Sequence, residues 1–341
     1  MSAKRCIITA FIPHLGCPND CVFCNQRKIS GSLEAPTFSQ LQATIREGLE
    51  RNRGRENIQL AFYGGSFTAI PLEEQTELLE GALPFLNSGE IASLRLSTRP
   101  DSIDGHTLER LKNYGVTTIE LGAQSMDKEV LAQTKRGHTP EDTVRASRQI
   151  KAAGFELILQ MMTGLPGDTK EKSLETARKI AELNPDGVRI YPTVIIKDTS
   201  LADMWQAGVY SAHTVEEAVD WCVEVVEIFD AANVPVIRLG LNPSDELSTS
   251  AALGGAYHPA FGELVRSRQL LGLARAILQC EKPEGRAVFG VHPSDVSAMI
   301  GQHRTNALSL ETEFAPLTVK VQGTNVKKGE VILMNFTCKT G

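Results

Sequence analysis

The stretch "HLGCPNDCVFCNQRKISG" (residues 14–31) places Cys17, Cys21 and Cys24 within eight positions of the chain. It follows a short apolar run, residues 6–12, that is typical of a β-strand. Seven cysteines spread at random over 341 residues would seldom put three so close together, so the spacing C-x3-C-x2-C indicates a metal site. The other four cysteines lie scattered, in contexts that suit a small buried side chain, which disfavours a disulfide framework.

Two kinds of metal site fit this spacing. His14 precedes Cys17 by three residues, and three cysteines with one histidine form an accepted tetrahedral zinc site. Alternatively, the three thiolates hold three irons of a 4Fe-4S cluster and leave the fourth iron without a protein ligand. The cysteines and the histidine alone leave both interpretations open.

The chain around the cysteines alternates short β-rich runs with longer segments of helical periodicity. Six strands are expected, "CIITAFI", "IQLAFY", "LRLST", "TTIEL", "FELILQM" and "GVRIYP", starting at residues 6, 58, 94, 117, 155 and 187. Helices are expected at residues 39–53, 73–87, 141–153, 170–183, 215–232 and 262–278, and a candidate seventh strand at residues 235–241. This order predicts right-handed crossovers and a parallel sheet, which fits an α/β, TIM-like partial (β/α)6 barrel.

The polar and glycine-rich segments follow the expected strands. The cysteine loop comes after the first strand, and "GGSFT", "RPD", "GAQS" and "TGLPG" come after the next four. Because chemistry in such folds gathers at the carboxyl ends of the strands, these segments are expected to meet at one mouth. We therefore expect residues 1–241 to form the barrel. Residues 242–341 are expected to form a C-terminal extension with a substrate loop, a helix and a small α+β appendage.

Composition limits the class of protein. The chain has 42% hydrophobic and 22% charged residues and a formal net charge of -6. No apolar run reaches the roughly 18 residues of a membrane helix, so we expect a cytoplasmic protein without a membrane partner. The acidic balance argues against a broad basic face, yet it leaves room for a local groove that binds a folded RNA.

The cysteine motif resembles that of the radical S-adenosylmethionine (SAM) superfamily, because an aromatic residue, Phe23, directly precedes the third cysteine. This resemblance implies a 4Fe-4S cluster on Cys17, Cys21 and Cys24, with SAM chelating the open iron. The reduced cluster would then split SAM into methionine and a 5′-deoxyadenosyl radical that abstracts hydrogen from substrate. It also implies an external electron donor such as flavodoxin or ferredoxin.

Further segments match the SAM-binding positions of this superfamily. The glycine-rich turn would offer backbone groups to the SAM amino group, and the "GAQS" segment with its downstream arginine resembles oxygen-independent coproporphyrinogen oxidase. The planar guanidinium of that arginine suits the SAM carboxylate. The residues that the resemblance assigns to SAM are Gly64, Gly65, Ser66, Thr68, Ser97, Gln124, Arg136 and Met162. His138 is interpreted as a surface histidine that caps a helix.

The segment "VRIYPTVIIKDTSLADMWQAGVY" (residues 188–210) resembles the catalytic subunit of Elongator, and the likeness covers about residues 5–240. Elongator's subunit spaces its first two cysteines more widely and continues into an acetyltransferase domain, for which this sequence shows no counterpart. The chain is therefore expected to resemble a short bacterial form of that branch. Carboxymethylation of the tRNA wobble uridine is not carried over with the resemblance.

By this likeness the expected substrate is an RNA, with tRNA as the first candidate. The RNA would approach through a basic patch near Arg27, Lys28, Lys135 and Arg266, and the expected substrate residues are Tyr191, Tyr257, His258 and Arg266. Two alternatives stay open. One is a radical SAM enzyme that acts on a small molecule or a tetrapyrrole, and the other is a non-catalytic, zinc-stabilised RNA-binding protein. The sequence does not give an oligomeric state.

Overall fold

The computed structural model describes residues 6–12, 17, 19–24, 36–242 and 250–336. The chain divides into two compact units. The first comprises Met1–Thr214 with Val225–Tyr257, and the second comprises Val215–Glu224 with His258–Gly341. Each unit is described by itself.

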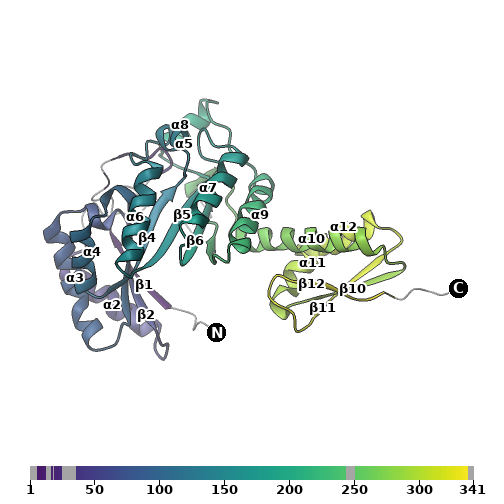
Figure 1. Ribbon diagram of the computed structural model, residues 1–341, viewed down its shortest axis with the longest axis horizontal. Helices are drawn as coiled ribbons and strands as arrows, with labels where there is room; N and C mark the ends of the chain where they lie inside the picture. The colour runs from purple at the N-terminus through teal and green to yellow at the C-terminus, as the bar shows by residue number, and fades with distance from the viewer. Residues whose placement is uncertain (1–5, 13–16, 18, 25–35, 243–249, 337–341) are drawn as a thin grey trace. The chain divides into compact units, whose positions relative to one another are not determined.

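The first unit is built on a seven-stranded sheet in the order β1-β2-β3-β4-β5-β6-β8. Every neighbouring pair in it is parallel. The strands are β1 Cys6–Ile12, β2 Ile58–Gly64, β3 Ser93–Thr98, β4 Val116–Gln124, β5 Glu156–Thr163, β6 Gly187–Pro192 and β8 Val236–Leu239. This sheet forms the partial barrel that the sequence predicts (Figure 1). In the register of β1 and β2, Ile12 pairs with Gly64, so the cysteine loop leaves the sheet beside the glycine-rich turn.

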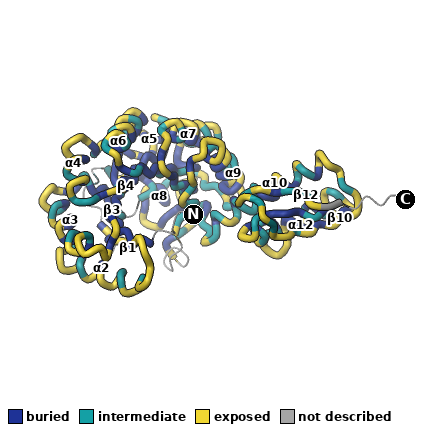
Figure 2. The backbone as a smooth tube through the Cα atoms, turned by 60° about the horizontal axis from the view of Figure 1, so that its bottom comes forward, coloured by how far each residue is buried: buried dark blue, intermediate teal, exposed yellow. Residues whose placement is uncertain are grey.

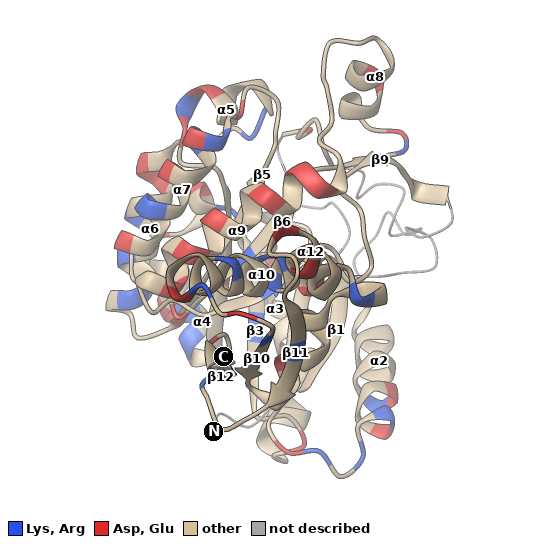
Figure 3. Cartoon of the chain, turned by 90° about the vertical axis from the view of Figure 1, so that its right-hand side faces the viewer, with Lys and Arg blue, Asp and Glu red and all other residues tan. Residues whose placement is uncertain are grey.

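Helices cover the outer face of this sheet (Figure 1). They are α2 Phe38–Arg51, α3 Leu72–Asn87, α4 Gly105–Asn113, α5 Lys128–Gln133, α6 Pro140–Ala152 and α7 Lys170–Glu182, with α9 Val215–Ala231 shared by both units. Threonines cap several of them; Thr139 forms a capping box with Asp142 at α6. Figure 2 shows buried strands beneath helices whose outer sides are exposed. Charges of both signs alternate on α5, α6 and α7 (Figure 3).

A buried charge cluster lies on the face of the sheet whose strand ends meet the glycine-rich turn. Glu120 of β4 is fully buried and pairs with Arg95 at 2.7 Å and with Arg189 at 2.9 Å. Gln160 donates to the second oxygen of Glu120 at 3.0 Å, and Tyr63 donates to the first. Because alternate strand residues share a face, this cluster lies on the same side as the mouth and deeper in the barrel.

A smaller layer lies over one end of the strands. It contains β7 Val194–Ile196, α8 Ser200–Gln206 and β9 Ala252–Gly255, and β7 pairs antiparallel with β9. Ile195, Leu201 and Ala202 form its buried apolar cluster, against which Phe23 and Tyr210 pack. This layer comes largely from the Elongator-like segment of the sequence.

The second unit is the predicted α+β appendage. It contains α10 Phe261–Glu281, β10 Arg286–Val291, α11 Val296–Ile300, α12 Thr305–Glu313, β11 Thr318–Gly323 and β12 Val331–Phe336. The sheet order is β11-β10-β12, with β11 parallel and β12 antiparallel to β10. Its core is formed by α10 and the sheet around the buried Phe289. Across the described ranges of both units, no helix has the length and apolarity that a membrane span requires.

Candidate functional site

A cavity at the carboxyl ends of the first strands brings most of the predicted residues together. Of the residues that the sequence assigned, it is lined by Cys17, Cys21, Cys24, Gly64, Gly65, Ser66, Ser97, Gln124 and Arg136. It also contains Arg99, which stands beside Ser97 in the segment where related enzymes contact the ribose of SAM, and it contains Asn19, Phe23, Thr98, Gly122 and Gln160, which the sequence did not assign. Four strands, β2, β3, β4 and β5, and the cysteine loop thus contribute to one site.

Backbone hydrogen bonds hold the described part of the cysteine loop on both sides. The Val22 amide donates to the Thr134 carbonyl at 3.1 Å, and the Val22 carbonyl accepts from the Leu201 amide at 2.8 Å. The neighbouring Phe23 packs against the apolar cluster of α8. The loop is therefore clamped between the end of α5 and the start of α8, which fixes where its thiols lie.

The three thiols line the cavity, and their donor chemistry fits an iron-sulfur cluster. Among the described residues, no three Cys, His, Asp or Glu side chains converge on one metal position. In a 4Fe-4S cluster each cysteine binds a different iron, so convergence on a single ion is not required. Burial raises the pKa of the Cys17 thiol, and the cations Arg136 and Arg99 oppose that rise. His14, the predicted fourth zinc ligand, lies outside the described residues.

The backbone of the glycine-rich turn passes very close to the backbone at the end of β1. Gly64 has φ +111°, and a Cβ there would lie 2.4 Å from the Ile12 carbonyl oxygen. The Gly65 amide donates to the same oxygen at 2.8 Å. A side chain at position 64 would push the strands apart, so glycine is required by the close approach of two backbones.

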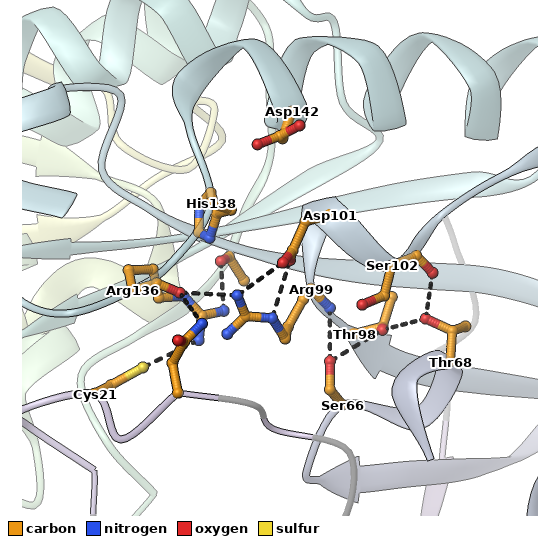
Figure 4. A network of polar contacts seen from close by, with 12 residues as sticks. Cys21, Ser66, Thr68, Thr98, Arg99, Asp101, Ser102, Arg136, His138 and Asp142 are labelled. Carbon is orange, nitrogen blue, oxygen red and sulfur yellow. Dashed lines mark hydrogen bonds and ion pairs between the residues drawn. The ribbon is translucent and has the colours of Figure 1, made fainter. Parts of the chain in front are cut away.

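Hydroxyl groups connect this turn to β3 (Figure 4). Ser66 Oγ accepts from the Arg99 amide at 3.0 Å and lies 3.2 Å from Thr98 Oγ1. Thr68 Oγ1 lies 2.6 Å from Thr98 Oγ1 and donates to the Ser102 carbonyl. Thr68 is not among the described residues that line the cavity; its hydroxyl holds the turn against β3 and Ser102, and its contact with SAM stays a prediction.

Gln124 lies in a strained part of β4. Its φ is +62°, and the register with β5 shifts between Gly122 and Gln124, which is a β-bulge next to the site. The side chain is buried, and its Oε1 has no hydrogen-bond partner among the described residues. A buried acceptor of this kind requires a donor, which a bound ligand can supply. The expected strand ended at Leu121; β4 instead continues through the "GAQ" of the motif.

Two arginines connect the strand ends to the cysteine loop (Figure 4). The fully buried Arg99 forms a fork onto Asp101, with two N–H···O bonds of 2.9 Å. Nη2, one of the two nitrogens of this fork, also donates to the Arg136 carbonyl at 2.9 Å. Arg136 donates from Nη2 to the Gly122 carbonyl at 2.8 Å and from Nη1 to Cys21 Sγ at 3.5 Å.

The interpretation of His138 as a surface cap is wrong. His138 is 4% exposed, and its Nε2 lies 3.1 Å from the Ala123 carbonyl, so Nε2 carries the proton and donates. Nδ1 is buried without a hydrogen-bond partner among the described residues. Burial lowers the pKa of His138 to about 4, and the positive charge of Arg136 acts in the same direction. The imidazole is therefore neutral at pH 7.

The remaining predicted residues are not among those that line the cavity. Met162 is half-buried near the end of β5 and pairs in register with Tyr191 of β6. Burial raises the pKa of Tyr191, which hydrogen-bonds Arg189. Tyr257 ends the first unit, whereas His258 belongs to the second. Their contacts with cofactor or substrate stay predictions.

The predicted basic patch is described only in part. Arg27 and Lys28 lie outside the described residues, and Lys135 is exposed directly after α5. Arg266, in the second unit, forms an ion pair with the buried Asp295 at 3.3 Å. Its charge is thus already paired within that unit.

Two family models show which superfamily the chain belongs to. The radical SAM superfamily matches residues 11–180, and the radical SAM C-terminal domain matches residues 185–269. The chain therefore belongs to the radical SAM superfamily of enzymes.

Among its relatives, the tRNA uridine(34) acetyltransferase of Methanocaldococcus infernus is 30% identical over 266 residues, which are 72% of this chain and 49% of the relative. Elongator complex protein 3 of Saccharomyces cerevisiae is 26% identical over 212 residues, 56% of this chain and 38% of the relative. The chain thus spans less than half the length of these curated relatives. The predicted likeness to Elongator's catalytic subunit is confirmed.

Solved structures confirm the fold. The structure of archaeal Elp3 from Methanocaldococcus infernus aligns with a TM-score of 0.61 at 22% identity, covering 82% of this chain and 64% of that chain. Coproporphyrinogen III oxidase from Escherichia coli, a radical SAM enzyme, aligns with a TM-score of 0.51 at 20% identity, covering 67% of this chain and 53% of that chain. Both likenesses concern the fold.

Proposed function

We propose that this radical SAM enzyme holds a 4Fe-4S cluster through Cys17, Cys21 and Cys24, binds SAM beside it, and modifies an RNA. The observation that carries the proposal is one cavity lined by all three cysteines, the glycine-rich turn, Gln124 and Arg136. With SAM bound, such a cluster supplies the electron that cleaves SAM to methionine and a 5′-deoxyadenosyl radical. The electron comes from an external donor of the flavodoxin or ferredoxin type.

The residues of the chain bind, orient and shield these groups. Gly64 and Gly65 line the cavity together with the three cysteines, so their backbone groups are available to a polar group of SAM. Gln124 presents a buried amide oxygen that accepts a hydrogen bond from the ligand. Phe23 closes one side of the loop with an apolar ring, which keeps water from a reactive site.

The RNA substrate is supported by the chain's similarity to tRNA-modifying relatives. The Methanocaldococcus infernus relative is a tRNA uridine(34) acetyltransferase, and its similarity covers 72% of this chain. Lys135 is an exposed cation directly beside the clamped cysteine loop, because Thr134 bonds Val22. A phosphate of an RNA bound at the mouth would meet this charge. A cytoplasmic location stays a prediction.

The cluster part of the proposal is tested by anaerobic reconstitution with iron and sulfide. The wild-type chain is expected to bind about four iron and four sulfide ions. Cys17→Ala, Cys21→Ala and Cys24→Ala should each lower that content sharply. Cys280→Ala, which removes an exposed thiol from α10, is the matched control and should keep it. One tightly bound zinc without sulfide would contradict the cluster and favour the zinc interpretation.

The RNA part needs a separate experiment. The reconstituted protein is crosslinked to total cellular RNA by ultraviolet light, and the bound RNA is sequenced. Enrichment of one RNA class, with tRNA expected first, supports the proposal. Recovery of no RNA above a heat-denatured sample contradicts the RNA substrate and favours a small molecule or a tetrapyrrole.

A further inference from the structure

The guanidinium of Arg136 lies against the sulfur of Cys21 (Figure 4). Nη1 donates to Sγ at 3.5 Å, and both side chains are buried, each 8% exposed. Nη2 donates to the Gly122 carbonyl of β4 at 2.8 Å. A Cβ on Gly122 would lie 2.6 Å from that Nη2, so the strand has room for the guanidinium because this position is glycine. The sheet thus fixes the cation at the cysteine loop.

The main chain at Arg136 is held just as firmly. Its amide donates to the Leu131 carbonyl at 3.0 Å. Its carbonyl accepts from Arg99 Nη2 at 2.9 Å and from Asn19 Nδ2, in the cysteine loop, at 3.4 Å. Gly137, with φ +80°, leaves the space that Asn19 fills. Segment 134–137 and the cysteine loop are therefore fastened together through both backbone and side chains.

We propose that Arg136 is a positioning residue that orients the Cys21 thiolate and raises the reduction potential of the cluster. This inference rests on the proposed function, because it presupposes the cluster. One electron from the external donor makes a thiolate-ligated cluster more negative. A cation that donates a hydrogen bond to a ligating sulfur stabilises the more negative, reduced state. Burial strengthens this effect because solvent screens the charge weakly.

The same guanidinium was assigned from the sequence to the SAM carboxylate. In the structure Nη1 and Nη2 make the contacts described above, whereas the buried Nε has no hydrogen-bond partner among the described residues. The two roles of Arg136 are experimentally separable. A contact with the carboxylate changes the affinity for SAM, and a contact with Cys21 changes the potential measured before SAM is added.

The test is a redox titration of the reconstituted protein without SAM, in which the reduced cluster is followed by electron paramagnetic resonance. Arg136→Gln removes the charge and the contact, and Arg136→Lys keeps the charge on a side chain that cannot make both contacts. Gly122→Ala keeps the arginine and displaces its guanidinium. The matched control is Arg145→Gln, which removes a positive charge from the half-exposed surface of α6, where Arg145 pairs with Asp142.

Arg136→Gln is expected to make reduction at least tenfold less favourable, a fall of about 59 mV for one electron. Gly122→Ala should lower the potential as well, Arg136→Lys should give an intermediate value, and Arg145→Gln should match the wild type. If Arg136→Gln takes up no iron, Arg136→Lys and Gly122→Ala decide the question. An unchanged potential in iron-loaded Arg136 variants would overturn the inference, and weakened SAM binding alone would favour the carboxylate contact. A wild-type chain that binds no iron and sulfide overturns the proposed function itself.

Discussion

Replacing His138 with glutamine should remove a pH-dependent part of the stability of the first unit. His138 is buried behind β4, donates to the Ala123 carbonyl and has a pKa of about 4, compared with an ordinary value of 6.5. Glutamine keeps a donor for that carbonyl and cannot take up a proton near neutral pH. The variant therefore isolates the ionisation of this one side chain.

The direction in which stability changes with pH follows from which state, folded or unfolded, binds the proton more readily. At pH 7 His138 is neutral in the folded chain and mostly neutral in the unfolded chain. As the pH falls below 6.5, the unfolded chain takes up a proton at this site, whereas the folded chain does so only near pH 4. The unfolded state then binds more protons, so the wild type loses stability. For these two pKa values the loss between pH 7 and pH 5 is about 2 kcal/mol.

The assay is urea unfolding at pH 7 and pH 5, followed by circular dichroism, for the wild type and His138→Gln. The wild type should lose about 2 kcal/mol more than the variant on acidification. His106→Gln, on the exposed surface of α4, serves as the control for the removal of a histidine. Equal losses in wild type and His138→Gln would refute the assignment of a buried neutral imidazole at this position.

Two further substitutions test the buried charge cluster inside the barrel and the packing of the cysteine loop against Gly137. Glu120→Gln leaves the guanidinium groups of Arg95 and Arg189 without their anion and should lower the free energy of unfolding by about 3–5 kcal/mol. A loss under about 1 kcal/mol in urea unfolding would show that water or another group pairs these cations. Gly137→Ala places a Cβ 1.8 Å from Asn19 Nδ2 at φ +80°, so it should cost about 1–3 kcal/mol and displace the cysteine loop. Its expected readout is reduced iron and sulfide content after reconstitution, and wild-type content would contradict the close fit.

Much of the fold could be predicted from sequence periodicity. The runs at residues 6–12 and 187–192 form β1 and β6 with the predicted bounds, because their β-branched and aromatic residues favour strands. The end of β4 was missed. Gly122 and Gln124 look like turn residues, but pairing with β5 across a bulge keeps them in the strand. That pairing is a tertiary contact, which local sequence does not encode.

The site was predictable where spacing carried the information. The cysteines, the glycine-rich turn, Gln124 and Arg136 all line one cavity, as their places after successive strands implied. The buried charges were not predictable in the same way. Arg99 and Glu120 are fully or almost fully buried, although their residue types are usually exposed. For Arg99, the nearby Asp101 in the sequence was a signal that the arginine is paired. Glu120 has no such local signal, because its partners come from separate strands.

His138 shows why a histidine motif alone can mislead. In sequence it stands just before the helix cap at Thr139, which suggested the surface. In the structure the chain turns inward after Gly137, and the ring lies beneath β4. The direction of that turn depends on the positive φ of the glycine and on its packing against Asn19.

The most direct test of the central claim is release of 5′-deoxyadenosine from SAM by the reconstituted, reduced protein. Wild-type protein incubated anaerobically with SAM and dithionite should release 5′-deoxyadenosine and methionine, as measured by liquid chromatography. Cys24→Ala should abolish the release, and Cys280→Ala should leave it intact. Release that persists in Cys24→Ala, or none from an iron-loaded wild type, would contradict SAM cleavage at this cysteine cluster.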